Sequence, residues 1–101
     1  MPTYVLLTTL TATGLETLHK HPQRLVAVNE EITKLGCKLI AQYALLGQYD
    51  FLNIIEAPDS ETIAHLSIDL GARGTASHTT IPALSIDELL QRLTGKVHLA
   101  R

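Results

Sequence analysis

Hydrophobic and polar residues follow two different spacings along this chain, and the changes between them predict the order of its elements. Short runs rich in β-branched and aliphatic residues predict four strands, at residues 3–10, 38–46, 51–56 and 75–84. Between these runs, apolar residues recur every three or four positions, which is the spacing of one helix face. The pattern therefore indicates a fold in which strands and helices are mixed.

Two internal stretches carry the helical spacing. The first stripe is formed by the aliphatic residues Leu25, Val28, Ile32 and Leu35. Pro22 lies near its first turn and Gly36 just past its end, which are favourable positions for proline and glycine. The second stripe is formed by Ile63, Leu66 and Leu70. Either Asp59 or Ser60 can cap the start of this second helix, because both side chains accept hydrogen bonds from free backbone amides.

Turn and capping residues mark the connections. We expect a loop around Gly14 after the first strand, with residues 16–20 adding at most a short turn. Residues 47–50 are few enough for a hairpin, and Gly47 can take a positive φ. Ser85 and Glu88 form a capping box, which predicts a short helix at the end of the chain.

The order β-α-β-β-α-β plus a terminal helix is typical of the ferredoxin-like α+β fold. In this topology the antiparallel sheet has the strand order 4-1-3-2, which puts the fourth strand on an edge. Pro82 lies in that strand, and proline favours an edge because it cannot donate a ladder hydrogen bond. With 101 residues the chain is expected to form one domain, over residues 1–101.

The strands carry apolar residues on both faces, although two helices can cover only one face of the sheet. Examples are residues 5–7, 39–41, 44–46 and 51–55. Each large apolar side chain left bare forgoes about 1.5–3 kcal/mol of burial. We therefore expect the open face to pack against a second copy in a homodimer or a higher homo-oligomer. The alternative is that the C-terminal helix folds over this face within one subunit.

Composition narrows the classes of partner. The net charge is −2 and the basic residues are scattered, so the clustered basic footprint of a nucleic-acid-binding protein is missing.

The apolar runs fall short of the roughly 20 residues of a membrane-spanning helix, and no signal-peptide pattern opens the chain, so we expect a cytoplasmic location. The single cysteine, Cys37, excludes an internal disulfide and a cysteine-rich zinc site and fits a small buried side chain.

Three segments carry a family resemblance. Residues 44–51 read ALLGQYDF, residues 55–59 read IEAPD, and residues 81–85 read IPALS. In this order, and with the strand that begins at Tyr4, they resemble the GYD domain family, which is named after a Gly-x-Tyr-Asp hairpin. The resemblance covers nearly the entire chain and implies a dimeric α/β-barrel form of the ferredoxin-like fold. It implies no catalytic residues and no cofactor.

Tyr49 and Asp50 are the first candidates for a site. A tyrosine hydroxyl and a carboxylate on one hairpin can orient a small ligand, or the carboxylate can accept its proton. The structural alternative is that Asp50 binds backbone amides of the turn while Tyr49 packs against a neighbouring subunit. Tyr4 is a further candidate donor for positioning a ligand.

Histidines supply the remaining candidates. His78 lies among polar residues of the fourth strand. If it faces the open side of the sheet, it could act as a base or a metal ligand. The alternative is that it is one of the polar residues that edge strands carry to limit aggregation. His19 and His21 can chelate a metal if the chain is extended there, whereas a solvated loop needs no metal. His65 is expected to face solvent, and His98 is isolated near the end of the chain.

Three functions remain open at this stage. One is an oligomeric, non-catalytic module that binds a small apolar molecule or a protein between paired sheets. The second is a cofactor-free oxygenase or isomerase, with His78 as base, Tyr49 or Tyr4 as donor and Asp50 as orienter. The third is a purely structural assembly protein. The sequence does not decide whether the chain is an enzyme, and it indicates neither a cofactor nor a metal.

Overall fold

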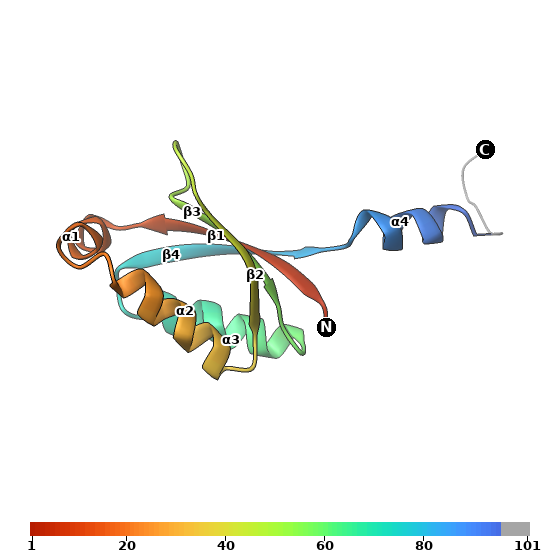
Figure 1. Cartoon of the computed structure of the whole chain (residues 1–101), viewed down its shortest axis with the longest axis horizontal. Coiled ribbons are helices and arrows are strands. Elements are labelled where there is room, and N and C mark those ends of the chain that lie inside the picture. Colours follow the sequence, from red (N-terminus) through yellow and green to blue (C-terminus); the bar gives the residue numbers. More distant parts are fainter. Residues whose placement is uncertain (96–101) are drawn as a thin grey trace.

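The structure is a computed structural model that describes residues 1–95 (Figure 1). Four strands and four helices lie within this part of the chain: β1 (Thr3–Leu10), α1 (Ala12–Lys20), α2 (Arg24–Lys34), β2 (Lys38–Ala44), β3 (Phe51–Glu56), α3 (Ser60–Gly71), β4 (Ala76–Ala83) and α4 (Ile86–Leu93). The alternation of strand and helix spacing in the sequence thus predicted an α+β fold correctly. Within residues 1–95 no helix has the length and apolar character needed to cross a bilayer.

The four strands form one antiparallel sheet in the order β2-β3-β1-β4. The central strand β1 places Leu6 opposite Asn53 of β3 and Thr80 of β4. Strand β4 is an edge strand, and it carries Pro82 opposite Tyr4. The other edge strand, β2, has a register irregularity between residues 39 and 41.

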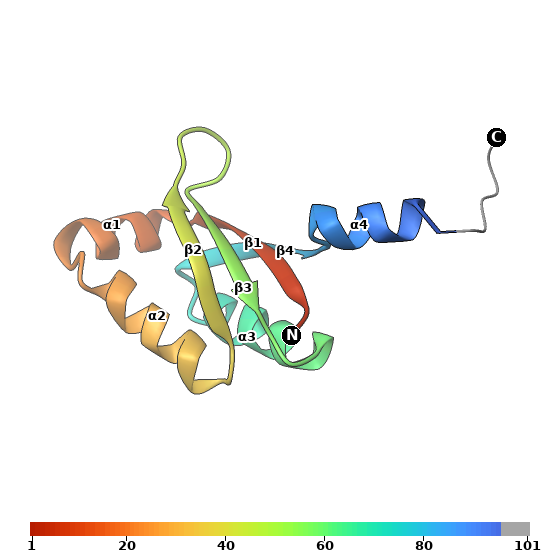
Figure 2. The same cartoon turned by 45° about the vertical axis from the view of Figure 1, so that its right-hand side comes forward.

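Helices α2 and α3 cover one face of the sheet, and the core lies beneath them (Figure 2). The two predicted helical stripes face this core, where Ile32 and Leu66 are each 1% exposed. Alternate residues of β1 point from the sheet into the same core, and Leu6 among them is also 1% exposed. Cys37 is buried here too, as expected of a small apolar side chain, and burial raises the pKa of its thiol above the ordinary value.

The prediction of a loop around Gly14 is wrong, because residues 12–20 form helix α1. Thr11 caps this helix by accepting a hydrogen bond from the backbone N–H of Gly14 at 3.1 Å. The Thr11 N–H also donates to the carbonyl of Thr75 at 3.0 Å, which holds the start of α1 against the chain that leads into β4. A Cβ on Gly14 would lie 1.9 Å from that same carbonyl oxygen. A glycine is therefore required at position 14 because the backbone of α1 approaches the backbone of Thr75 closely, and not because the chain turns there.

Helix α4 confirms the predicted capping box. Ser85 Oγ accepts a hydrogen bond from the Glu88 N–H at 3.0 Å and donates to Glu88 Oε1 at 3.1 Å. The helix extends away from the sheet in both views, and none of its residues is buried (Figures 1 and 2). The alternative in which this helix folds over the open face within the subunit is therefore wrong.

Candidate functional site

The four candidate residues from the sequence do not share one cavity. Tyr4 lies on the helix-covered side of β1, is 5% exposed, and its hydroxyl is 3.0 Å from Ser60 Oγ at the start of α3. It borders a depression beside α3 that also includes Ile68 and Pro82. Its hydrogen bond joins the first strand to the third helix.

His78 faces the helix-covered side of the sheet, so the prediction that it faces the open side is wrong. It is paired with Thr8 of β1, whose side chain is buried, and His78 Nδ1 lies 3.0 Å from Thr8 Oγ1. Burial lowers the pKa of His78 below its ordinary value, because desolvation penalises the charged imidazolium. The Nε2 atom is buried without a hydrogen-bond partner within residues 1–95.

Asp50 holds the hairpin onto the central strand. Its Oδ2 accepts a hydrogen bond from the Leu10 N–H at 2.7 Å, while its own N–H donates to the Thr8 carbonyl at 2.8 Å. Gly47 has φ 115°, which confirms the predicted turn glycine. Asp50 thus accepts from a backbone amide, as the structural alternative supposed, but that amide belongs to Leu10 at the end of β1 and not to the turn. Tyr49 lies half-buried in the same loop and lines neither of the cavities that contain Tyr4 and His78.

We expect the Asp50→Ala variant to lose about 1–2 kcal/mol of unfolding free energy, because the Leu10 N–H loses its carboxylate acceptor. Urea denaturation followed by circular dichroism, at one fixed protein concentration, measures the loss. Asp50→Asn is the matched control, since an amide oxygen can still accept this bond, and it is expected to cost less than the alanine variant. Equal stability of wild type and the alanine variant would contradict the role given to Asp50.

A polar network under α2 was missed by the sequence analysis. Gln42 Nε2 donates to Asn29 Oδ1 at 3.0 Å and to Asn53 Oδ1 at 2.6 Å, and Asn29 Nδ2 donates back to Gln42 Oε1 at 3.0 Å. The signal that could have revealed it is the pair Gln42 and Asn53, each a polar residue inside an otherwise apolar strand. Their register as direct neighbours places both on the helix-covered side.

This network borders a cavity of about 110 Å³ between the sheet and helices α1 and α2. The cavity is lined by residues from all four strands and from α1, α2 and α3, among them Thr8, Asn53 and His78. The structure thus gathers several polar side chains of the helix-covered side around one space. It lies inside the subunit, not between paired sheets.

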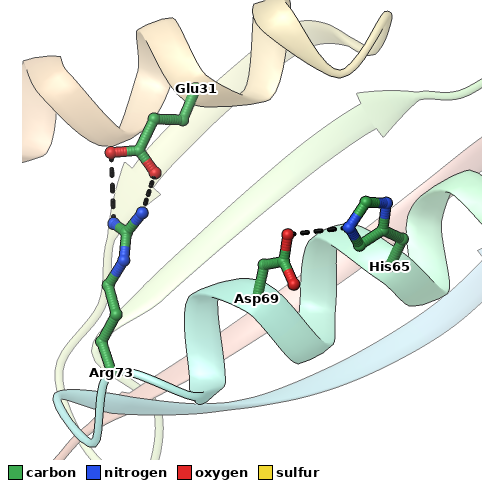
Figure 3. A network of polar contacts seen from close by, with 4 residues as sticks. All are labelled: Glu31, His65, Asp69 and Arg73. Atoms are coloured by element: carbon green, nitrogen blue, oxygen red, sulfur yellow. Dashed lines mark hydrogen bonds and ion pairs between the residues drawn. The ribbon is translucent and has the colours of Figure 1, made fainter.

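Two ion pairs involve side chains of α2 and α3 (Figure 3). The guanidinium of Arg73 makes two hydrogen bonds to the Glu31 carboxylate, one of them between Nη1 and Oε1 at 3.2 Å, and so joins α2 to the segment after α3. His65 Nε2 lies 2.8 Å from Asp69 Oδ2 on the exposed side of α3. The prediction that His65 faces solvent is confirmed.

The other two histidine candidates belong to α1. His19 lies in the last turn of this helix and His21 forms its C-cap, so the extended chain that metal chelation required is not formed. Across residues 1–95 no group of three or more histidine, cysteine or carboxylate side chains has the arrangement of a metal site. His98 lies outside the described residues.

The open face of the sheet carries apolar side chains that no other element of the described chain covers. Alternate residues of β1 and β3 point to this side, as Val5 and Ile54 do, and all are only partly buried. Near the edges of the sheet, Ile40, Tyr43 and Ile81 are 48%, 59% and 43% exposed. Apolar surface of this extent is typical of a protein–protein contact.

Comparison with known proteins gives three results. The model of the GYD domain family matches residues 4–93. The chain is 44% identical over 94 residues to the "Glutamine synthetase and cystathionine beta-lyase binding protein" of Thermus thermophilus, covering 92% of this chain and 99% of that protein. It also resembles the crystal structure of FFRP-DM1, with a TM-score of 0.54, 18% identity and coverage of 83% of this chain and all of that one. The last likeness shows the ferredoxin-like fold alone.

Proposed function

This chain belongs to the GYD domain family, and from that premise we propose that it is a cytoplasmic, single-domain, homo-oligomeric module that binds another protein and catalyses no reaction. The observation that carries the proposal is the amount of apolar surface its own fold leaves uncovered, on the open sheet face and on α4. The name of the Thermus relative, which describes a binding protein for two enzymes, supports it. The unpaired Cys37 suits a reducing compartment.

The open sheet face is proposed to bind a second copy, so that two sheets pack face to face as in a dimeric α/β barrel. Full burial of a large apolar side chain contributes about 1.5–3 kcal/mol, and several such side chains lie on this face. Because Tyr4 and His78 point to the helix-covered side, neither would line a space between paired sheets. The proposal therefore places no small-molecule site there.

Helix α4 is proposed to be the element that binds the partner protein. Its exposed apolar residues follow the spacing of a single helical stripe: Ile86, Leu89, Leu90 and Leu93. An amphipathic helix with such a stripe binds by laying it into an apolar groove. Because α4 extends away from the sheet, pairing through the sheet would leave this stripe accessible.

The catalytic alternative finds no support in the geometry. A base, a positioning donor and an orienting carboxylate must lie within hydrogen-bond reach of one substrate. Here the carboxylate of Asp50 accepts a backbone hydrogen bond, Tyr4 bonds Ser60, and His78 borders a different cavity. We therefore favour the binding module over the oxygenase or isomerase.

The test is direct binding to purified glutamine synthetase and cystathionine β-lyase of the same organism, measured by surface plasmon resonance. We expect wild type to bind at least one of them. The double variant Leu89→Glu/Leu93→Glu is expected to bind at least about 30-fold more weakly, because it removes two central apolar contacts.

Ile68→Glu is the matched control, since this isoleucine is also exposed but lies on α3. It is expected to bind as wild type does. Absence of binding by wild type to both enzymes would refute the assignment of these partners. Equal binding by the α4 double variant would refute the role of the helix.

A further inference from the structure

The cavity between the sheet and helices α1 and α2 has no part in the binding surfaces proposed above. Its walls are mainly aliphatic, with side chains from several elements: Leu6, Leu10, Leu18, Leu25, Val28 and Ile32. Leu6 and Ile32 are almost fully buried, whereas Arg24 and Arg73 are exposed. The arginines therefore mark the mouth of the cavity, and the core residues mark its inner end.

The polar side chains at the sheet side of the cavity have free hydrogen-bonding capacity. Asn53 uses its oxygen to accept from Gln42, and no hydrogen bond within residues 1–95 uses its amide nitrogen. His78 Nε2 is likewise without a partner in the described chain. A buried polar atom without a partner is unfavourable, so an oxygen-bearing ligand or water beside His78 Nε2 would stabilise this region. The free Asn53 amide nitrogen lines the same cavity and can donate to such an oxygen.

The charged side chains that line the cavity are all positive. Arg24 and Arg73 both line it, whereas no acidic side chain does within the described residues. Arg73 is already bonded to Glu31 (Figure 3), but no ion pair within residues 1–95 involves Arg24. A guanidinium at the mouth of an apolar cavity favours a carboxylate, which it can bind through two parallel hydrogen bonds.

We propose that this cavity binds a small aliphatic oxo carboxylate, with its carboxylate on Arg24, its chain against the aliphatic walls and its oxo oxygen accepting from Asn53. The volume of about 110 Å³ is below the roughly 150 Å³ of a cavity that holds benzene, so the cavity takes fewer non-hydrogen atoms than benzene has. The carboxylate therefore lies outside, on Arg24 at the mouth, and only the oxo group and a short aliphatic chain enter. The corresponding amino acid is disfavoured, because its ammonium group would lie near the guanidinium of Arg24, and no acidic side chain of the described residues lines the cavity.

Isothermal titration calorimetry of the purified chain, with no partner enzyme present, tests this proposal independently of the proposed function. The probes are 2-oxopentanoate, norvaline, which carries an ammonium group where the first has the oxo group, and 2-pentanone, which lacks the carboxylate. We expect saturable binding of 2-oxopentanoate with a Kd of about 1 mM or lower. Norvaline and 2-pentanone are each expected to bind at least about 10-fold more weakly.

Two variants locate the binding. Arg24→Gln removes the charge from an exposed position, so the fold is retained, and we expect it to weaken 2-oxopentanoate binding about 10-fold or more. Leu25→Trp fills the cavity and is expected to abolish binding. Arg92→Gln, on α4 and away from the cavity, is the control and is expected to bind as wild type does.

The proposal is overturned if wild type shows no saturable binding of 2-oxopentanoate up to about 10 mM. It is equally overturned if Arg24→Gln and Leu25→Trp, with circular dichroism spectra like that of wild type, bind the probe unchanged. Equal affinity for norvaline would refute the oxo carboxylate as the ligand class.

Discussion

Replacing Gly14 with alanine is expected to lower the melting temperature by about 10 °C or more, a large effect for one methyl group. The added Cβ would lie 1.9 Å from the Thr75 carbonyl oxygen and 2.9 Å from its carbonyl carbon, so backbone would have to move. That carbonyl also accepts the Thr11 N–H, and separating α1 from it would break this hydrogen bond. Thermal unfolding followed by circular dichroism measures the shift.

Gly71→Ala is the matched control. This glycine also lies in a helix, α3, but a Cβ there would be 3.8 Å from the nearest backbone atom, the Ala76 carbonyl oxygen, which is an ordinary contact. Alanine favours helix over glycine, so we expect an unchanged or slightly higher melting temperature. If Gly14→Ala melted like wild type, the close approach of α1 to Thr75 would be refuted.

The double variant Tyr43→Glu/Ile81→Glu is expected to convert a dimer into a monomer. Both side chains are exposed and lie on the two outer strands, so the glutamates would introduce charge near both edges of the open face. A buried charge without a partner costs several kcal/mol, which weakens association by at least about 100-fold. Light scattering coupled to size-exclusion chromatography should show wild type at twice the chain mass of 11.0 kDa and the variant at the chain mass.

Ile68→Glu is again the suitable control, because it adds a glutamate away from the open face, on α3, at a side chain that is 70% exposed. We expect this variant to keep the wild-type mass. A monomeric wild type at about 100 µM, or a double variant that stays dimeric, would contradict pairing through the open face.

The strands and the two long helices could be predicted because their spacing is a local property of the sequence. In α3, for example, Ile63, Leu66 and Leu70 are all buried, and Asp59 caps the helix as its side chain suggests. Helix α1 could not be predicted in this way. Its glycine is explained by a contact with Thr75, which lies far away in the sequence.

The candidate site was less predictable, because it depends on which face of the sheet each side chain occupies. The sequence of β4 around His78 is polar at successive positions, so no alternation fixes its face. The register with β1, which pairs His78 with Thr8, decides it. Likewise, Asp50 was a sound candidate by residue type, but its Leu10 partner is brought near only by the antiparallel pairing of β1 and β3.

The two free edges of the sheet limit how the protein can polymerise. Edge strands can recruit further strands into open-ended fibrils, because their backbone groups on one side are unpaired. Here one edge carries Pro82, which has no N–H to offer, and the other is interrupted between residues 39 and 41. Growth by strand addition is thus hindered on both sides. If the open sheet face pairs with a second copy as proposed, that two-fold contact closes on itself, so it would bury apolar surface without open-ended growth.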